Sequence, residues 1–215
     1  MSTEGLRDPQ SESAPQPNWL QLDRSPHALQ FYSGDGFLLD SLAWFISTAL
    51  EDGNSVFILA TPMHMDGIAE RLNAQGVDTN TAATKGRYVT VDALQVLAHL
   101  TVNGELSRAR FDEFIREVFM PLEAAAESKP KTVAACGEVV ALLWAEGKAE
   151  AAIELEHFWN EVADRVRCRL RCFYPIASFP DPGQNELFLK LCAEHADVIP
   201  HQSHIRMVAG RDRVA

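Results

Sequence analysis

Gly137 and Glu138 form a glycine–glutamate pair directly after an apolar run of strand length. A carboxylate at the end of a buried strand can face a ligand crevice, where it can act as a base or bind a metal ion. The same carboxylate can instead cap the helix that follows, because acidic groups favour the positive end of the helix dipole. The sequence leaves both roles open for Glu138.

Histidine is the second residue type that could take part in chemistry. His27 lies near the start of the apolar sequence, and His64 lies where a nucleotide-binding protein has its phosphate loop. A lone histidine is more often a surface or core-edge residue than a ligand, and its position gives His64 the stronger case. His195, His201 and His204 lie near the end of the chain, where we expect surface positions.

The segment 150–166 predicts an amphipathic helix that contains Glu154, Glu156 and His157. The solvated face of the helix is the expected place for these charges. The spacing Glu154-x-x-His157 could put two metal ligands on one helical face, but neither a second copy nor an H-E-x-x-H motif accompanies it. We expect no metal, no cofactor and no catalytic residue in this chain.

The turn after the apolar run 55–60 departs from the phosphate loop of an NTPase. That loop, G-x-x-x-x-G-K-[ST], needs glycines so that backbone N–H groups can surround the phosphates, and a lysine to meet their charge. Residues 60–68 read A-T-P-M-H-M-D-G-I, in which Pro62 removes a donor and Met63 makes the turn more apolar. We expect no conventional ATP hydrolysis, and a non-standard nucleotide site stays open. Neither a G-x-S-x-G elbow nor a G-x-G-x-x-G turn after a strand is present.

The four cysteines, Cys136, Cys168, Cys172 and Cys192, lie in apolar or strand-like segments. A chain of this size does not need disulfides to fold, so we expect reduced and mostly buried thiols. The spacing of Cys168 and Cys172 is not that of a zinc knuckle. On an extended strand these two side chains would face the same side, so Cys172 could line a pocket.

Strands and helices are predicted to alternate along the chain. The continuous apolar run at 55–60 is typical of a strand that is buried on both faces, and 131–136 predicts another buried strand. Residues 87–91 and 169–174 predict two further strands. Amphipathic segments separate these runs, and the longest extends from about 107 to 126. This alternation favours a doubly wound α/β sheet with right-handed crossovers, in which ligands bind at the carboxyl ends of the strands.

Size and charge narrow the classes of protein further. The chain has 215 residues, of which 47% are hydrophobic, enough for one substantial core. Its formal net charge of -11 and the lack of a Lys/Arg run argue against direct binding of nucleic acid. Neither a signal peptide nor an apolar stretch of about 18 residues is present, so we expect a cytoplasmic protein without membrane contact. We expect flexible tails at 1–24 and 201–215 and one domain over 25–200.

Several short motifs occur in an order that resembles a known family over roughly residues 25–200. They are His27-x-x-x-Phe31-Tyr32, a Gly-Val-Asp turn at 76–78, Cys-Gly-Glu at 136–138 and Cys172-x-Tyr174. In this order the chain is similar to the MEDS family, the methanogen/methylotroph sensory domains named for a dichloromethane-responsive, DcmR-like regulator. The resemblance implies a three-layer, RecA/KaiC-like α/β fold with a mostly parallel central sheet and no Walker A loop.

The resemblance also implies a role in sensing small hydrocarbon derivatives for transcription regulation or histidine-kinase signalling. The family's histidine maps to His27, its aromatic pair to Phe31 and Tyr32, and its Gly-Glu pair to Gly137 and Glu138. No DNA-binding or kinase segment accompanies these motifs, so we expect a stand-alone sensory domain that passes its signal to a protein partner.

We expect a ligand pocket at the strand ends, with mostly apolar walls and a few polar groups. The expected pocket residues are His27, Phe31, Tyr32, Met63, His64, Gly137, Glu138, Trp144, Cys172 and Tyr174. Taken singly, Trp144 and the methionines are better explained by core packing. Val139 stands where many relatives have Met, which is a mild apolar change.

Two other functions stay open. A degenerate nucleotide-binding or metal-assisted hydrolase would use Glu138 and would bind a nucleotide or a divalent ion, which the turn at 60–68 disfavours. A partner-switching interaction protein would dock its acidic surface on a basic partner and would respond to no small ligand.

Overall fold

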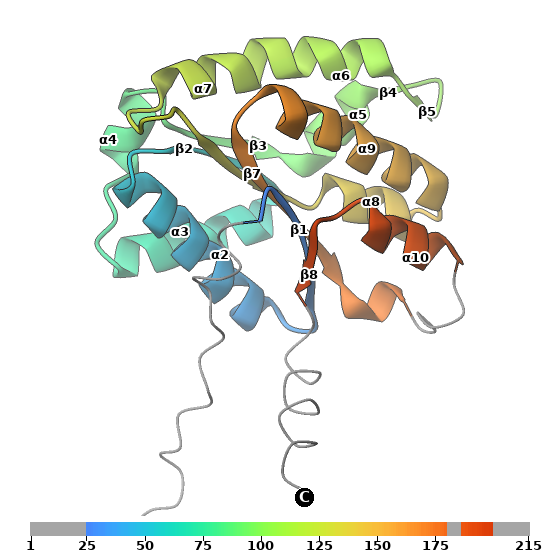
Figure 1. Ribbon diagram of the computed structural model, residues 1–215. Helices are drawn as coiled ribbons and strands as arrows, with labels where there is room; N and C mark the ends of the chain where they lie inside the picture. Colours follow the sequence, from blue (N-terminus) through green and yellow to red (C-terminus); the bar gives the residue numbers. More distant parts are fainter. Residues whose placement is uncertain (1–24, 180–185, 200–215) are drawn as a thin grey trace, which may run out of the picture.

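A parallel sheet forms the centre of the protein (Figure 1). The computed structural model describes residues 25–179 and 186–199, so the predicted tails at 1–24 and 201–215 lie outside the described residues. Within them, six strands lie in the order β3-β2-β6-β7-β1-β8, and every neighbouring pair is parallel. The strands are β1 (His27–Tyr32), β2 (Ser55–Ala60), β3 (Tyr88–Asp92), β6 (Val133–Gly137), β7 (Cys168–Pro175) and β8 (Asp197–Ile199).

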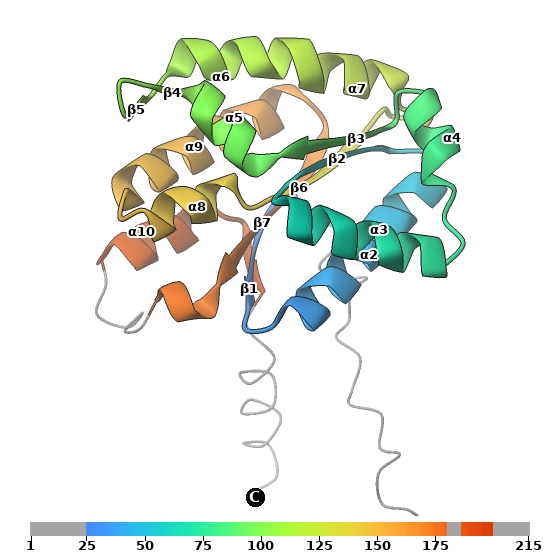
Figure 2. The ribbon, with the colours of Figure 1, turned by 180° about the vertical axis from the view of Figure 1, so that it is seen from behind.

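Helices cover both faces of this sheet, as the views from the front and from behind show (Figures 1 and 2). One face packs against α2 (Asp35–Glu51), α3 (Pro62–Ala74) and α4 (Thr79–Thr84). The other face packs against α5 (Ala93–Leu100), α6 (Arg108–Phe114), η1 (Ile115–Phe119), α7 (Met120–Ala125), α8 (Val139–Ala145), α9 (Ala149–Arg165) and α10 (Glu186–Ala193). These three layers confirm the predicted RecA-like α/β fold.

Alternate residues of each strand face opposite helical layers. In β2, Phe57 and Leu59 lie in the core beneath α8 and α9, whereas Val56 and Ile58 lie in the core beneath α2. Every residue of β2 is buried, because both of its faces are covered. This double burial explains why the strand reads as a continuous apolar run rather than as an alternating one.

The same alternation divides the side chains of β1 and β7. Leu29 of β1 and Cys172 of β7 lie in the core on the α9 face, whereas Tyr32 and Phe173 lie in the core on the α2 face. His27 precedes Leu29 by two positions, so it also points to the α9 face. Residues that are close in sequence are therefore separated by the thickness of the sheet.

The predicted helix over 107–126 is present with one irregularity. A π-helical turn, η1, joins the α-helical segments α6 and α7. A short hairpin of β4 (Thr101–Val102) and β5 (Glu105–Leu106), which was not predicted, precedes it. Among the described helices, none is long and apolar enough to cross a membrane.

Two glycines with positive φ, one after α2 and one after α3, allow a prediction about stability. Gly53 and Gly76 have φ values of 76° and 75°, which L side chains rarely adopt, so Ala costs about 1–2 kcal/mol at either position. A Cβ on Gly53 would also lie 3.2 Å from the backbone nitrogen of Ser128, whereas a Cβ on Gly76 meets nothing. We expect Gly53→Ala to lower the free energy of unfolding more than Gly76→Ala, as measured by urea denaturation. Equal losses would contradict this close approach.

Candidate functional site

The carboxylate of Glu138 joins the ends of two neighbouring strands. β2 ends at Ala60 and β6 ends at Gly137, and the two strands are paired in parallel, so the residues that follow them lie at the same edge of the sheet. The backbone amide of Thr61 donates to Oε1 of Glu138 at 2.6 Å, and the Thr61 hydroxyl donates to it at 2.8 Å. Nδ1 of His64 lies 2.9 Å from the same oxygen. Glu138 thus holds the first turn of α3 against the end of β6.

Glu138 occupies the N-cap position of α8, but its side chain makes no capping hydrogen bond to that helix. The carboxylate faces the junction of β2 and α3 instead and is only 5% exposed. Of the two roles that the sequence left open, capping by the side chain is absent. A role in binding ligand stays a prediction.

His64 connects this carboxylate to the neighbouring side chains of the edge. Its ring meets Tyr32 edge-on, with the centroids 6.1 Å apart, and meets Phe173 edge-on at 6.0 Å. Its Nε2 lies 3.6 Å from Oδ1 of Asp35, at the start of α2. We call Tyr32, Asp35, Thr61, His64 and Glu138 the carboxyl-edge network.

Hydrogen bonding favours the charged forms of His64 and Glu138 in this network. The hydrogen bond to Glu138 raises the pKa of His64 above its usual value, and burial offsets this only in part. Burial opposes the ionisation of Glu138, yet the hydrogen bonds from His64 and Thr61 outweigh it and leave the Glu138 pKa below its usual value. Burial, followed by the charges of Glu138 and Asp35, raises the pKa of Tyr32, so its phenol stays neutral. Both shifts favour an imidazolium–carboxylate pair at the centre of the network.

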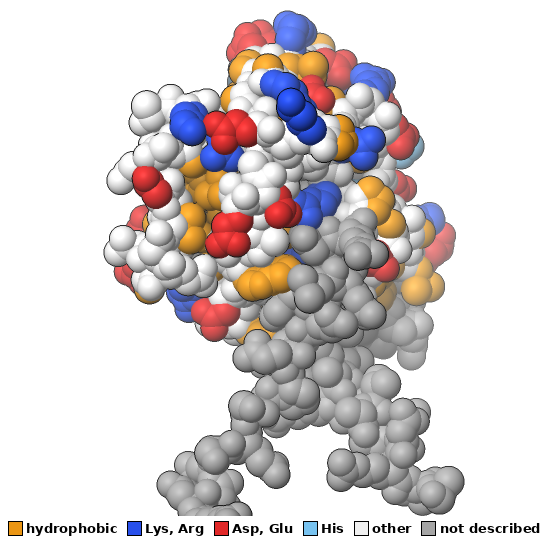
Figure 3. Space-filling view, turned by 60° about the vertical axis from the view of Figure 1, so that its left-hand side comes forward, with side chains coloured by type: hydrophobic (Ala, Val, Ile, Leu, Met, Phe, Trp, Pro, Cys, Tyr) orange, Lys and Arg blue, Asp and Glu red, His pale blue; other side chains and the backbone are white. Residues whose placement is uncertain are grey.

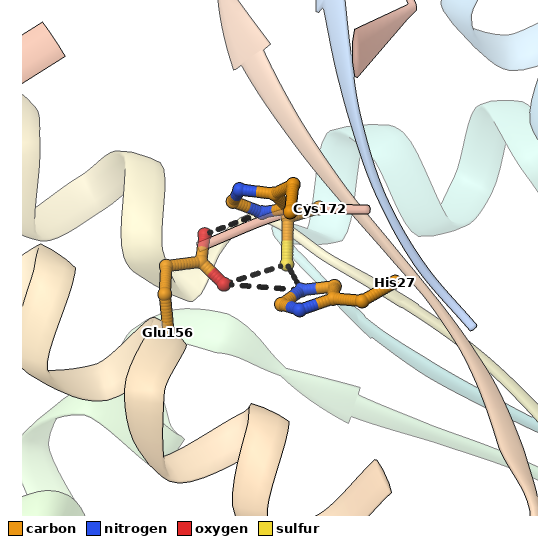
Figure 4. A group of neighbouring side chains, drawn as sticks. His27, Glu156 and Cys172 are labelled. Atoms are coloured by element: carbon orange, nitrogen blue, oxygen red, sulfur yellow. Dashed lines mark hydrogen bonds and ion pairs between the residues drawn. The ribbon is translucent and has the colours of Figure 1, made fainter. Parts of the chain in front are cut away.

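A second polar group is buried on the opposite face of the sheet, beneath α9 (Figure 4). Its side chains come from β1, β7, α9 and the residues that follow α10. One nitrogen, sulfur or oxygen atom of each side chain lies within 4.8 Å of the others, which is close enough for the four to hold a metal ion. We call His27, Glu156, Cys172 and His195 the buried His-Cys-Glu cluster.

Glu156 is the centre of this cluster and is 0% exposed. Its Oε2 lies 3.3 Å from Nε2 of His27 and accepts a hydrogen bond from the Cys172 thiol at 3.1 Å. Its Oε1 accepts a hydrogen bond from the Tyr174 hydroxyl at 3.0 Å and lies 3.4 Å from Nε2 of His195. A fully buried carboxylate is thus surrounded by four polar groups.

The cluster shifts the pKa values of its members. Burial opposes the ionisation of Glu156, but His195 and His27 outweigh it and hold the Glu156 pKa well below its usual range. Burial, reinforced by the charge of Glu156, raises the pKa of the Cys172 thiol and of the Tyr174 phenol well above their usual values. The Cys172 thiol is therefore protonated and shielded, unlike that of a reactive cysteine.

A small apolar cavity lies between the sheet and helices α8 and α9. Its volume is ≈ 20 Å³, and Val140 and Trp159 line it together with Gly137 and Cys172. A space of this size holds about one water molecule. A Cβ on Gly137 would lie 3.1 Å from the carbonyl oxygen of Leu59, so glycine is also needed for the close approach of β6 to β2.

The structure distributes the ten predicted pocket residues among several places. Tyr32, His64 and Glu138 lie together in the carboxyl-edge network. His27 and Cys172 lie together in the buried His-Cys-Glu cluster, on the other face of the sheet. A strand order was needed to see this separation, because β1 and β7 each contribute residues to both faces.

Of the remaining predicted residues, Gly137 lines the cavity, and the other four lie in aromatic packing or at the surface. Trp144 and Tyr174 pack with Phe179, with ring centroids 4.8 Å and 5.8 Å from it, and Phe31 meets the same ring edge-on at 5.5 Å. Met63, in the first turn of α3, is 65% exposed. Core packing is thus the observed role of Trp144, whereas Met63 is free to contact another molecule.

Sequence reasoning missed two members of the buried cluster. It placed Glu156 on the solvated face of its helix and His195 at the surface, and both placements are wrong, since these residues are 0% and 8% exposed. The signal for Glu156 is its position between Leu155 and Trp159, at the spacing of the core-facing stripe of α9. The next residue, His157, is the solvated one, with 63% of its side chain exposed.

The carboxyl-edge network predicts that stability depends on pH. Because folding raises the pKa of His64, its contribution is fully present below pH 6.5 and is lost as the pH rises through the raised value. Because folding lowers the pKa of Glu138, its contribution is present above pH 4.5 and is lost as the pH falls through the lowered value. The pair therefore stabilises the fold most between these two values.

We expect His64→Gln to lower the free energy of unfolding by about 1.5–3 kcal/mol inside that window, the range for a hydrogen bond to a charged group. The loss should shrink at a pH well above the raised pKa of His64, where the wild-type imidazole is neutral. Urea denaturation of both proteins at the two pH values measures the difference. His99→Gln, at an exposed histidine, is the control. A loss that is the same at both pH values would contradict the charged pair.

Comparison with known proteins identifies the family of this chain. Residues 26–189 match the family described as MEDS, the MEthanogen/methylotroph, DcmR Sensory domain. No curated protein and no solved structure matches the chain. The family suggests a sensory or signalling role and is compatible with a protein that is not an enzyme. Since the match spans well over half of the sequence, as the resemblance predicted, the chain belongs to the MEDS family of sensory domains.

Proposed function

We propose that this chain senses a small organic molecule, a hydrocarbon derivative, and relays its presence to a partner protein, either a transcription regulator or a histidine kinase. The sensory family supports the general role. The apolar cavity beneath α8 and α9 is the observation that supports the class of ligand. A small apolar molecule gains free energy by leaving water for such a space, and it needs no charged partner there.

The size of the cavity supports a link between binding and movement. A volume of ≈ 20 Å³ has room for about one water molecule, so it is too small for a substituted one-carbon compound. A ligand in this place would therefore move α8 or α9 away from the sheet, since a packed core resists compression. A ligand that binds the moved state more tightly shifts the population toward it, which is what a sensor requires.

The position of Glu138 offers a route for the signal. Gly137 lines the cavity, and Glu138 directly follows it at the start of α8. Movement of this helix end would displace the carboxylate that holds Thr61 and His64 in the first turn of α3. Met63 is exposed in the same turn, so a partner protein that contacts Met63 would respond to the displacement of this turn.

The surroundings of Glu138 give less support to a hydrolase. Its carboxylate is buried and accepts hydrogen bonds from Thr61 and His64, so it is not free to activate a water molecule. On the face seen in Figure 3, basic side chains are scattered among acidic ones rather than gathered into a stripe for nucleic acid. In the proposed role, residues 25–200 act as one sensory domain in the cytosol, without nucleic acid or membrane as a partner.

Thermal unfolding of the full chain with a panel of small halogenated, methylated and hydroxylated carbon compounds tests this function. A ligand that binds only the folded state adds about 2.7 kcal/mol at 100 times its dissociation constant, which raises Tm measurably. We expect Ala135→Val to abolish the rise, because its two added methyl groups fill the cavity that Ala135 lines.

Ala134→Val is the matched control. Ala134 is as buried as its neighbour, but it faces the α2 layer and does not line the cavity. A rise in Tm that survives Ala135→Val would contradict the cavity as the ligand site. A rise with ATP or GTP and magnesium would favour the hydrolase, and no rise with any compound would favour a partner-switching protein.

A further inference from the structure

We propose that the buried His-Cys-Glu cluster binds one divalent transition-metal ion, with Zn²⁺ as the best match. The cluster brings four separate segments together on the α9 face of the sheet. Figure 4 labels three of its side chains, His27, Glu156 and Cys172, which point toward one another. Metal binding at this place does not require the organic ligand proposed above and has its own readout, and Cys172 belongs to both the cluster and the cavity wall.

The spacing of the donor atoms matches a tetrahedral site. Bonds of about 2.0 Å from Zn²⁺ to nitrogen or oxygen and 2.3 Å to sulfur put neighbouring donors about 3.3–3.6 Å apart. Nε2 of His27 lies 3.3 Å from Sγ of Cys172 and 3.3 Å from Oε2 of Glu156, and the sulfur lies 3.1 Å from that oxygen. Nε2 of His195 lies 3.4 Å from Oε1 of Glu156. These pairs already have nearly the distances that a shared ion requires.

Both imidazoles are oriented by acceptors on their outer sides. Nδ1 of His27 lies 2.7 Å from Oδ1 of Asn160, whose amide nitrogen donates to the carbonyl of Glu194 at 2.8 Å and so fixes the oxygen as the acceptor. Nδ1 of His195 donates to the carbonyl of Leu191 at 2.8 Å. A proton on each Nδ1 leaves the Nε2 lone pair pointing into the cluster. Metal-bound histidines have this arrangement almost without exception.

The inward-facing nitrogens of both rings lie against other members of the cluster. Nε2 of His195 makes no hydrogen bond to any residue that the structure describes, and the side chain is 0% exposed. Both Nε2 atoms face the oxygens of Glu156, so a cation placed between them would be attracted to this buried carboxylate. Zn²⁺ with the carboxylate of Glu156 and a thiolate of Cys172 has no net charge.

The mixture of donors selects among metal ions. Ca²⁺ and Mg²⁺ require oxygen ligands, whereas imidazole and thiolate suit Zn²⁺. Four protein donors fill the tetrahedral coordination and leave no position for water, as in structural zinc sites. On binding, the Cys172 thiol releases its proton to solvent and both rings coordinate as neutral imidazoles, so affinity falls as the pH falls.

Titration of the full chain, freed of metal by a chelator, tests this site with Co²⁺ as a spectroscopic probe and with Zn²⁺. We expect one equivalent of Co²⁺ per chain, with the strong d–d absorption of tetrahedral coordination and a thiolate-to-cobalt charge-transfer band. One equivalent of Zn²⁺ should remove both signals and raise Tm. A folded wild-type chain that shows neither band and no change in Tm would overturn the proposal and leave a buried ion-pair network.

Cys172→Ser and Cys168→Ser form a matched pair of variants. Both exchange a thiol for a hydroxyl on the same face of β7, but Cys168 is not a member of the cluster. We expect Cys172→Ser to lose the charge-transfer band and to bind Zn²⁺ more weakly by over about 100-fold, the upper range for loss of an outer partner. Cys168→Ser should keep both properties. An identical Co²⁺ spectrum in Cys172→Ser would overturn the assignment.

Asn160 is a positioning residue and gives a second test if Cys172→Ser does not fold. It is only partly buried, and it acts on the metal through His27. We expect Asn160→Ala to weaken Zn²⁺ binding roughly 10- to 100-fold, and Asn160→Asp, which keeps an acceptor for Nδ1, to restore it. Competition with a chromophoric chelator measures both affinities. Unchanged affinity in Asn160→Ala would overturn the arrangement of ligands proposed here.

Discussion

Helices cover both faces of the central sheet, so a polar side chain on one of its inner strands has to find its partners inside the protein. On the α9 face, His27 and Cys172 meet this requirement through Glu156. On the α2 face, Gln30 accepts a hydrogen bond from Ser41 of α2. These pairings also fix how the helices lie on the sheet. Rotation of α9 about its axis by one residue position would put His157 in the place of Glu156. The contacts of Glu156 with His27 and Cys172 would then be lost.

The fold could be predicted from the sequence because strands buried on both faces leave continuous apolar runs, as β2 does. Glu138 and His64 could be singled out because they lie just beyond such runs, where parallel strands end. Glu156 could not, because a charged residue in an amphipathic helix resembles a solvent-facing one until the partner of that helix is known. His195 was missed for a related reason, since its burial depends on contacts with α9 rather than on its own neighbours in sequence.

The grouping of the site residues was also beyond the sequence, because it depends on strand order. β1 lies beside β7, and the pleat of both strands sends successive side chains to opposite layers. Tyr32 therefore joins His64 on one face, while Cys172 joins His27 on the other. The apolar cavity lies close to both groups, since its wall includes Cys172 of the buried cluster and Gly137, the neighbour of Glu138. A displacement of the buried cluster or of Glu138 would therefore move a residue of the cavity wall.

The place of β1 in the sheet has a consequence for how the protein is made. β1 is the first described strand of the chain, yet its neighbours in the sheet are β7 and β8, the last two. At a synthesis rate of about 5–20 residues per second, β1 leaves the ribosome on the order of ten seconds before β7. During that time β2, β3 and β6 can pair with one another, whereas β1 has no strand to join and its apolar side chains stay exposed. The nascent chain therefore needs protection at its beginning for as long as its end is missing.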